Sequence, residues 1–271
     1  MTVASAPVSS GAVGTYLDRI LVAHRERAAA DERSFKDLIE QAGAEPPARP
    51  FAAALAGDPD LSVIAEIKRR SPSKGDLDPH LDPARLAHAY VAGGAIALSV
   101  LTDHEFFGGS PADLSTARAA CELPVLRKDF TVDPRDVCDA RLMGADCVLL
   151  IAAALTDDEL STYLETASQV GIDALVETHA DEELDRALAA GATLVGVNQR
   201  DLHTFTVDPD RAVRLAERIP AGVVKVAESG VRGAEDALRL RRAGYDAVLV
   251  GESLVTAADP AAVLHAIRTA L

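Results

Sequence analysis

The chain contains 271 residues, 48% of them hydrophobic, which is enough to bury a large core in one α/β barrel or in two smaller domains. Its 42 acidic and 27 basic residues give a formal charge of −15, and aromatic residues make up only 4%, which disfavours nucleic acid as a partner. The longest wholly apolar run, residues 147–155, is too short to cross a bilayer, and the first residues lack the pattern of a secretory signal, so we expect a cytoplasmic protein without a membrane span.

Residues 1–60 contain no strand signal, and we expect them to form an N-terminal helical extension packed on the domain that follows. The stretch Tyr16–Arg33 mixes apolar residues with many charges in a way that suits an amphipathic helix. A second helix is predicted to begin at Phe35, and a short helix is predicted over Phe51–Ala56.

Residues 61–271 repeat one order of signals, in which a short apolar strand is followed by a loop, a helix and a glycine. The expected strands are Val63–Lys68, Ala97–Leu101, Val125–Lys128, Cys147–Ile151, Ala174–Glu177, Leu194–Asn198, Val223–Glu228 and Ala247–Gly251. Near-continuous apolar strands that alternate with helices indicate a parallel sheet covered on both faces. Eight such units, with no long linker and no GxGxxG after the first strand, favour a closed (β/α)8 TIM barrel over a doubly wound open sheet.

Helix starts are indicated by Asp or Ser before Pro, because the side-chain oxygen can cap the helix and proline presets the first helical φ. These pairs are Asp82-Pro83, Ser110-Pro111, Asp133-Pro134, Asp208-Pro209 and Asp259-Pro260. Thr156 and Glu159 form a capping-box pattern, and Asp181 is predicted to cap a further helix.

Ionisable side chains stand at the ends of several expected strands. Glu66 and Lys68 are two residues apart, so they share one face of the first strand and point into the barrel mouth if Ile67 points out to the helices. The other strand-end groups are Lys128, Glu177, Asn198 with Arg200 just beyond it, and Glu228. Any one of them alone would be an ordinary rim charge or half of an ion pair. Together they indicate an active site, because a barrel gathers the carboxyl ends of its strands around one centre.

Small residues follow the last two strands. Ser229 and Gly230 come after the seventh, and Gly251, Glu252 and Ser253 come after the eighth. Glycines in loops often serve only to make a turn, but backbone N–H groups at these two places can approach an anion closely. Since (β/α)8 barrels commonly hold phosphate there, we predict phosphate binding through Ser229, Gly230, Gly251 and Glu252.

Other motifs carry little chemistry. The three cysteines have neither CxxC spacing nor a partner set, so we expect no disulfide, and the seven histidines show no metal-ligand spacing, so we expect no metal. The segment Ser71-Pro72-Ser73-Lys74-Gly75 after the first strand is either an ordinary loop or a mobile lid over an anionic substrate.

The barrel region resembles the indole-3-glycerol-phosphate synthase family. The matching segments are Val63–Gly75, Phe107–Ser110, Pro124–Phe130, Ala145–Asp146, Leu149–Ile151, Leu175–Glu177, Gly196–Leu202 and Ala227–Gly230. This resemblance implies a cofactor-free carboxy-lyase of tryptophan biosynthesis. Its anionic sugar-phosphate substrate would be 1-(2-carboxyphenylamino)-1-deoxyribulose 5-phosphate, converted to indole-3-glycerol phosphate with loss of carbon dioxide and water.

The resemblance also implies roles for single residues. Lys128 would be the general acid for ring closure, Glu177 the base for dehydration, and Lys68 either a second acid or the partner of a substrate anion. For proton exchange near neutral pH, we expect neighbouring cations and desolvation to lower the pKa of Lys128, and burial to raise that of Glu177.

Glu66 and Asn198 would position hydroxyls and lysines, Glu228 and Ser229 would complete the catalytic shell, and Arg200 would face a substrate anion or brace its loop. The apolar pocket that the resemblance implies for the aromatic ring, next to Ser71 of the loop after the first strand, consists of Pro72, Phe107, Phe130, Leu149, Leu202 and Val250. For Phe107 and Phe130, ordinary core packing is an equally good interpretation of the sequence.

Two alternatives stay open at this point. One is another phosphate-binding barrel of amino-acid biosynthesis, such as phosphoribosylanthranilate isomerase or the tryptophan synthase α chain, although an isomerase would not need Lys68, Lys128 and Glu177 in this arrangement. The other is a non-catalytic barrel that binds a sugar phosphate or a partner protein. The sequence does not decide between a monomer and a weak homo-oligomer.

Overall fold

The computed structural model describes residues 15–72, 74–202 and 204–270. The first 14 residues of the predicted extension, and Ser73 of the predicted lid, lie outside these ranges. No helix within the ranges is both long and apolar enough to cross a membrane.

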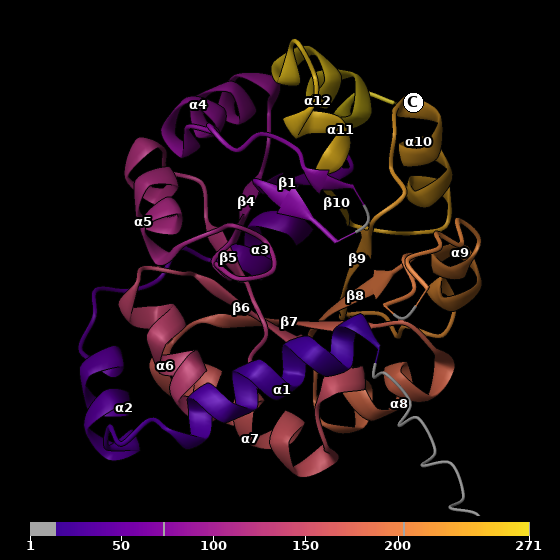
Figure 1. Ribbon diagram of the computed structural model, residues 1–271. Coiled ribbons are helices and arrows are strands. Elements are labelled where there is room, and N and C mark those ends of the chain that lie inside the picture. The colour runs from indigo at the N-terminus through magenta and orange to yellow at the C-terminus, as the bar shows by residue number, and fades with distance from the viewer. Residues whose placement is uncertain (1–14, 73, 203, 271) are drawn as a thin grey trace, which may run out of the picture.

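Eight parallel strands close into a barrel, which confirms the predicted (β/α)8 fold and excludes the open sheet (Figure 1). The barrel strands are β1 (Ser62–Ile67), β4 (Ala97–Leu101), β5 (Val125–Lys128), β6 (Cys147–Ile151), β7 (Asp173–Thr178), β8 (Leu194–Asn198), β9 (Val224–Glu228) and β10 (Ala247–Val250). β1 pairs with both β4 and β10, so the ring has no free edge. Every predicted strand is present with its ends within one residue, although Lys68 and Gly251 lie just beyond their strands.

Helices surround the strands (Figure 1). They are α4 (Pro83–Gly93), α5 (Pro111–Ala120), α6 (Pro134–Leu142), α7 (Asp157–Val170), α8 (Asp181–Ala189), α9 (Arg211–Ala216), α10 (Ala234–Arg242), α11 (Glu252–Val255) and α12 (Pro260–Arg268). A short 3-10 helix, η1 (Ala152–Ala154), follows β6. Capping before proline is confirmed at the starts of α4, α5, α6 and α12, and the predicted capping box starts α7.

Two predicted helix caps are wrong. Asp208 does not start α9; its carboxylate accepts from the backbone N–H of Asp210 and pairs with Arg214, which makes a turn before the helix. Asp181 is the first residue of α8 and not its cap, and its carboxylate is paired with Arg218 instead.

The N-terminal extension contacts the barrel at both ends. α1 (Tyr16–Ala29) crosses the face where the strands end, α2 (Phe35–Gly43) packs beside α6, and α3 (Phe51–Ala56) places Phe51 and Leu55 in the interior core at the opposite end (Figure 1). α1 ends at Ala29, before the predicted Arg33, and Arg135 donates to the carbonyl oxygens of Ala28 in its last turn and of Asp31 just beyond it.

Alternation along the strands positions the site. Ile64, Leu126, Leu175 and Val226 belong to the interior core, and the residue two places after each one is Glu66, Lys128, Glu177 and Glu228, respectively. Because side chains two apart share a strand face, each charged group also points inside, one layer nearer the carboxyl end. Ile67 belongs to the outer core between strands and helices, as predicted.

Candidate active site

All the predicted site residues line one cavity of about 560 Å³ at the carboxyl end of the barrel. They are Glu66, Lys68, Ser71, Pro72, Phe107, Lys128, Phe130, Leu149, Glu177, Asn198, Arg200, Leu202, Glu228, Ser229, Gly230, Val250, Gly251 and Glu252. The fold therefore places groups from all parts of the barrel sequence around one cavity. Its volume is that of a small-molecule binding site.

Lys128 lies between two buried carboxylates. Its Nζ is 2.9 Å from Oε2 of Glu177 and 3.7 Å from Oε2 of Glu228. Both glutamates are 1% exposed, whereas the lysine reaches the cavity. One ammonium group thus lies within ion-pair distance of two carboxylates.

The two predicted pKa shifts are wrong in direction. Burial alone would lower the pKa of Lys128, but the carboxylates of Glu177, Glu228 and Glu66 outweigh it and raise this pKa well above its usual value. Burial would likewise raise the pKa of Glu177, but Lys128 and His179 hold it well below its usual value. The reason is mutual pairing, because each ion stabilises the charged form of the other. The site therefore holds a protonated lysine and an ionised glutamate.

Glu228 takes the opposite shift. Burial and the nearby charge of Glu177 raise its pKa to about 8, although Lys128 partly opposes them. Its Oε1 is buried and has no hydrogen-bond partner among the described residues. A Cβ atom at Gly196 would collide with this oxygen, so only glycine on β8 leaves room for the Glu228 carboxylate.

Asn198 and His179 surround the other side of Glu177. Asn198 Nδ2 donates to Glu177 Oε1 at 3.1 Å, and His179 Nε2 lies 3.3 Å from the same oxygen as an ion-pair contact. His179 Nδ1 is also 3.2 Å from Glu183 Oε2. Burial would lower the pKa of His179, but Glu177 and Glu183 raise it to about 9. A second cation thus joins Lys128 in holding Glu177 ionised.

Glu66 forms an ion pair with Lys68 on the β10 side of the cavity. A Cβ atom at Gly251 would collide with Oε1 of Glu66, so this glycine gives the carboxylate its place. The second lysine of the site is therefore held by its own carboxylate, separately from the pair of Lys128 and Glu177.

The two loops predicted to bind phosphate lie side by side. Ser229 and Gly230 both have positive φ, 65° and 77°, and the carbonyl oxygen of Ser229 accepts from Gln199 Nε2 at 2.7 Å. Ser253 Oγ donates to the carbonyl oxygen of Val231 at 3.2 Å, which links the loop after β10 to the loop after β9. Successive backbone groups in such turns form concave sites that suit anions.

The loop after β1 covers the same end of the cavity. β2 (Arg70–Ser71) pairs with β3 (Gly75–Asp76) in a short hairpin, and Lys74 Nζ lies 3.7 Å from Glu252 Oε1. The contact of Lys74 with Glu252 links this hairpin to the loop after β10, and its role as a lid stays a prediction.

The apolar side of the cavity contains Phe107 and Phe130, whose ring centroids are 6.2 Å apart, together with Leu149. Arg200 Nη1 donates to the carbonyl oxygen of Phe205 at 3.1 Å, an arrangement that braces the loop after β8. The cavity is therefore polar at the strand ends and apolar at one wall, a combination typical of small-molecule sites.

Residues 17–267 match the family model described as indole-3-glycerol phosphate synthase. The chain belongs to the indole-3-glycerol phosphate synthase family. It is 54% identical to "Indole-3-glycerol phosphate synthase 2" of Streptomyces coelicolor over 243 residues, 89% of this chain and 94% of that protein. It is also 50% identical to "Indole-3-glycerol phosphate synthase" of Rhodococcus jostii, over 91% of this chain and 92% of that protein.

Among solved structures, a 3-hexulose-6-phosphate synthase from Salmonella typhimurium is similar with a TM-score of 0.63 at 14% identity, covering 78% of this chain and 98% of that one. At this identity the likeness supports the barrel fold alone.

Sequence reasoning on this indole-3-glycerol phosphate synthase family member missed several groups at the cavity. Asp103, Asp129 and Arg232 line it, and His179 contacts Glu177 from outside the lining. Strand spacing could have found His179, because it lies two residues after Glu177 and therefore on the same face. The others lie in loops, whose side-chain directions no periodicity predicts.

Glu228→Gln is expected to change how stability depends on pH. The pKa of Glu228 is raised in the folded protein. Its contribution to the unfolding free energy is therefore fully present below the unfolded-state pKa, about 4.3, and is lost as pH rises through about 8. Each pKa unit corresponds to about 1.4 kcal/mol, so the parent protein should lose a few kcal/mol of unfolding free energy between pH 5 and 9, with His179 contributing in the same direction. Glu228→Gln should show a clearly smaller loss in urea unfolding experiments.

Glu235→Gln, at an exposed position of α10, is the matched control and should follow the parent protein. Parallel stability curves for Glu228→Gln and the parent would show that the Glu228 carboxyl does not titrate abnormally.

Proposed function

We propose that the protein converts 1-(2-carboxyphenylamino)-1-deoxy-D-ribulose 5-phosphate into indole-3-glycerol phosphate, with release of carbon dioxide and water. Family membership supports this reaction, and the observation that carries the assignment of roles is the position of Lys128 between Glu177 and Glu228 inside a cavity with two loops suited to phosphate. The reaction involves no net redox change, so we assign no cofactor.

Binding would fix both ends of a flexible substrate. The phosphate is proposed to lie between the loops of Ser229–Gly230 and Gly251–Glu252, and the carboxylated ring against Phe107 and Phe130. The intervening chain must then fold so that the ring carbon bearing the carboxylate faces the ribulose carbonyl carbon. Holding the two ends supplies this geometry in advance, which removes much of the entropic barrier to ring closure.

Ring closure would use Lys128 as the acid. The aromatic carbon that carries the carboxylate attacks the ribulose carbonyl carbon, and the carbonyl oxygen takes a proton from Lys128 and becomes a hydroxyl. The carbon–carboxylate bond then breaks, carbon dioxide leaves, and its bonding electrons restore the aromatic ring. The raised pKa of Lys128 ensures that the proton is present before the substrate arrives.

Dehydration would use Glu177 as the base. The new hydroxyl leaves as water after protonation, with Lys68 as the acid, and electrons from the ring nitrogen assist its departure. A proton is then removed by Glu177 to give the indole. Because Glu177 is ionised and held by Lys128, Asn198 and His179, it is aligned for this step, and transfer of the Lys128 proton to the substrate oxygen would make Glu177 more basic.

The remaining polar groups would hold this arrangement. Glu66 orients Lys68, Glu228 shares the charge of Lys128, and Arg200 braces the loop after β8.

We further propose a cytoplasmic location, because the thiols Cys121, Cys138 and Cys147 are all free, which suits a reducing compartment.

Turnover of the synthetic carboxyphenylamino ribulose phosphate tests the proposal. The parent protein should produce one indole fluorophore and one carbon dioxide for each substrate consumed. Isomerisation of phosphoribosylanthranilate without indole formation would support the rival isomerase, and binding of the substrate without turnover would support a non-catalytic barrel.

A further inference from the structure

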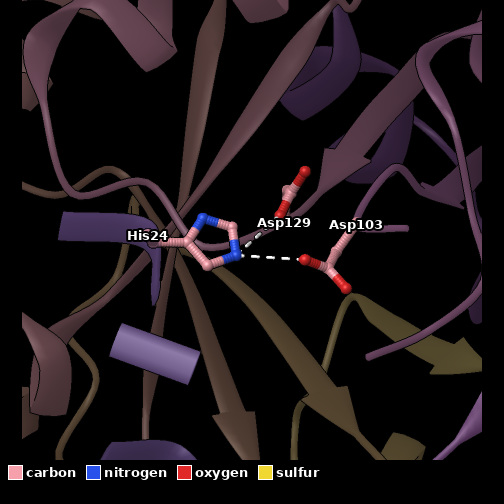
Figure 2. Close-up of side chains that lie close together, drawn as sticks. All are labelled: His24, Asp103 and Asp129. Atoms are coloured by element: carbon pink, nitrogen blue, oxygen red, sulfur yellow. Dashed lines mark hydrogen bonds and ion pairs between the residues drawn. The ribbon is translucent and has the colours of Figure 1, made fainter. Parts of the chain in front are cut away.

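His24 of helix α1 reaches into the mouth of the barrel. Its side chain is 8% exposed, and its Nε2 lies 3.1 Å from Oδ2 of Asp103 and 3.8 Å from Oδ1 of Asp129. Figure 2 shows the imidazole facing both carboxylates, which come from the loops after β4 and β5. Three groups that are far apart in sequence thus meet at one buried point between the extension and the barrel.

The two aspartates in turn hold the backbone of the aromatic wall. Asp103 Oδ1 accepts from the backbone N–H groups of Phe106 at 2.6 Å and Phe107 at 3.2 Å, and Asp129 Oδ1 accepts from that of Phe130 at 2.8 Å. Burial would raise the pKa of Asp103, but the bonds from His24 and Phe106 keep it below its ordinary value. Both carboxylates therefore serve as acceptors for the loops that carry the cavity's aromatic rings.

The imidazole also packs directly on this wall. The ring of His24 lies 5.4 Å from that of Phe130, centroid to centroid, and Phe130 in turn contacts Phe107. One side chain of α1 is thus hydrogen-bonded to Asp103, lies within ion-pair distance of Asp129 and packs against the ring of Phe130.

His24, Asp103 and Asp129 form the one cluster among the described residues whose geometry could hold a metal ion. Both of its carboxylates, however, already have arginine partners. Asp129 pairs with Arg127 at 3.1 Å, and Asp103 lies 3.6 Å from Arg27. A divalent cation would add two positive charges at a buried point whose acid groups already have cationic partners, which is unfavourable. Hydrogen bonding of the imidazole satisfies the group without that cost.

We propose that His24 is a positioning residue, through which α1 sets the place of Phe107 and Phe130 and hence the fit of the substrate's aromatic ring. This role rests on the proposed function. Lys128 is held by Glu177 and Glu228 and not by His24, so the effect falls on substrate binding more than on the chemical step.

Substitution at His24 with a matched control tests this role. His24→Leu, which keeps burial but removes the hydrogen bond, should raise KM about tenfold and change kcat less than about threefold. His24→Gln can still donate to Asp103 and should restore KM to near the parent value. Arg25→Gln disrupts the bonds from the same helix to Glu159 of α7 and to the carbonyl oxygen of Ala154, away from the aromatic wall, and should leave both constants unchanged.

Hydrogen–deuterium exchange gives a readout that does not require turnover. His24→Leu should increase exchange in segments 103–109 and 129–132, whereas Arg25→Gln should not. The exchange experiment therefore tests the role of His24 separately from the proposed function. An inactive parent protein would contradict the proposed function, but the change in exchange in His24→Leu would still be interpretable. Parent-like KM and exchange in His24→Leu, or an equal rise of KM in Arg25→Gln, would overturn the role of His24. Loss of parent activity in EDTA that Zn²⁺ restores would instead assign the three groups to a metal.

Discussion

Lys128→Met is expected to lower kcat by at least ~10²-fold, because general acid catalysis contributes factors of that size or more and methionine cannot supply a proton. Carbon dioxide release and indole formation should slow by the same factor, because ring closure precedes both decarboxylation and dehydration. Stopped assays that follow carbon dioxide release and indole fluorescence in parallel would measure this. A variant that released carbon dioxide at the parent rate would remove Lys128 from the acid role.

A matched lysine variant separates chemistry from folding. Lys36→Met replaces an exposed lysine of α2, far from the cavity lining, and should keep the parent rate. Loss of Lys128 leaves Glu177 and Glu228 buried without their shared cation, so circular dichroism is needed to show that the variant is folded. A folded Lys128→Met protein with the parent kcat would contradict the mechanism.

Glu177→Gln is expected to lower indole formation by at least ~10²-fold, the low end for loss of an acid–base group. Glutamine keeps the shape of the side chain and can still accept from Lys128 and Asn198, so KM should change little. Since Glu177 acts after decarboxylation, a single turnover should release carbon dioxide faster than it forms indole. This separation distinguishes Glu177→Gln from Lys128→Met, which slows both.

Carbon dioxide and indole appearing with one common rate in Glu177→Gln would contradict the assignment of Glu177 to dehydration alone. Glu183→Gln is a useful comparison, because Glu183 contacts His179 but not the cavity. It should leave the order of the two products unchanged.

Strand periodicity was sufficient to predict which strand-end side chains line the cavity. Glu177 and Lys128 each follow an interior leucine by two residues, so a parallel barrel places both at the same rim. The same rule could have placed His179 beside Glu177. Asp103 and Asp129 could not be placed in this way, since their directions depend on loops and on the docking of α1.

The electrostatics of the site was beyond prediction from composition. The expected pKa shifts of Lys128 and Glu177 were reversed because the two groups lie 2.9 Å apart, a distance that only the closed barrel defines. The space for the Glu228 carboxylate depends on Gly196 of the neighbouring strand β8. The sequence alone does not distinguish this glycine from other small residues. The pKa shifts and the space for Glu228 thus both depend on distances between pairs of residues, and not on residue types alone.

A crystal structure with indole-3-glycerol phosphate bound would test the central claim most directly, namely that Lys128 and Glu177 act on one molecule whose phosphate lies between the loops after β9 and β10. We predict the phosphate against the backbone of Gly230 and Gly251, and both Lys128 Nζ and the Glu177 carboxylate within hydrogen-bond reach of the ligand, about 3 Å. A ligand that bound elsewhere, or that contacted neither of these two side chains, would contradict the account.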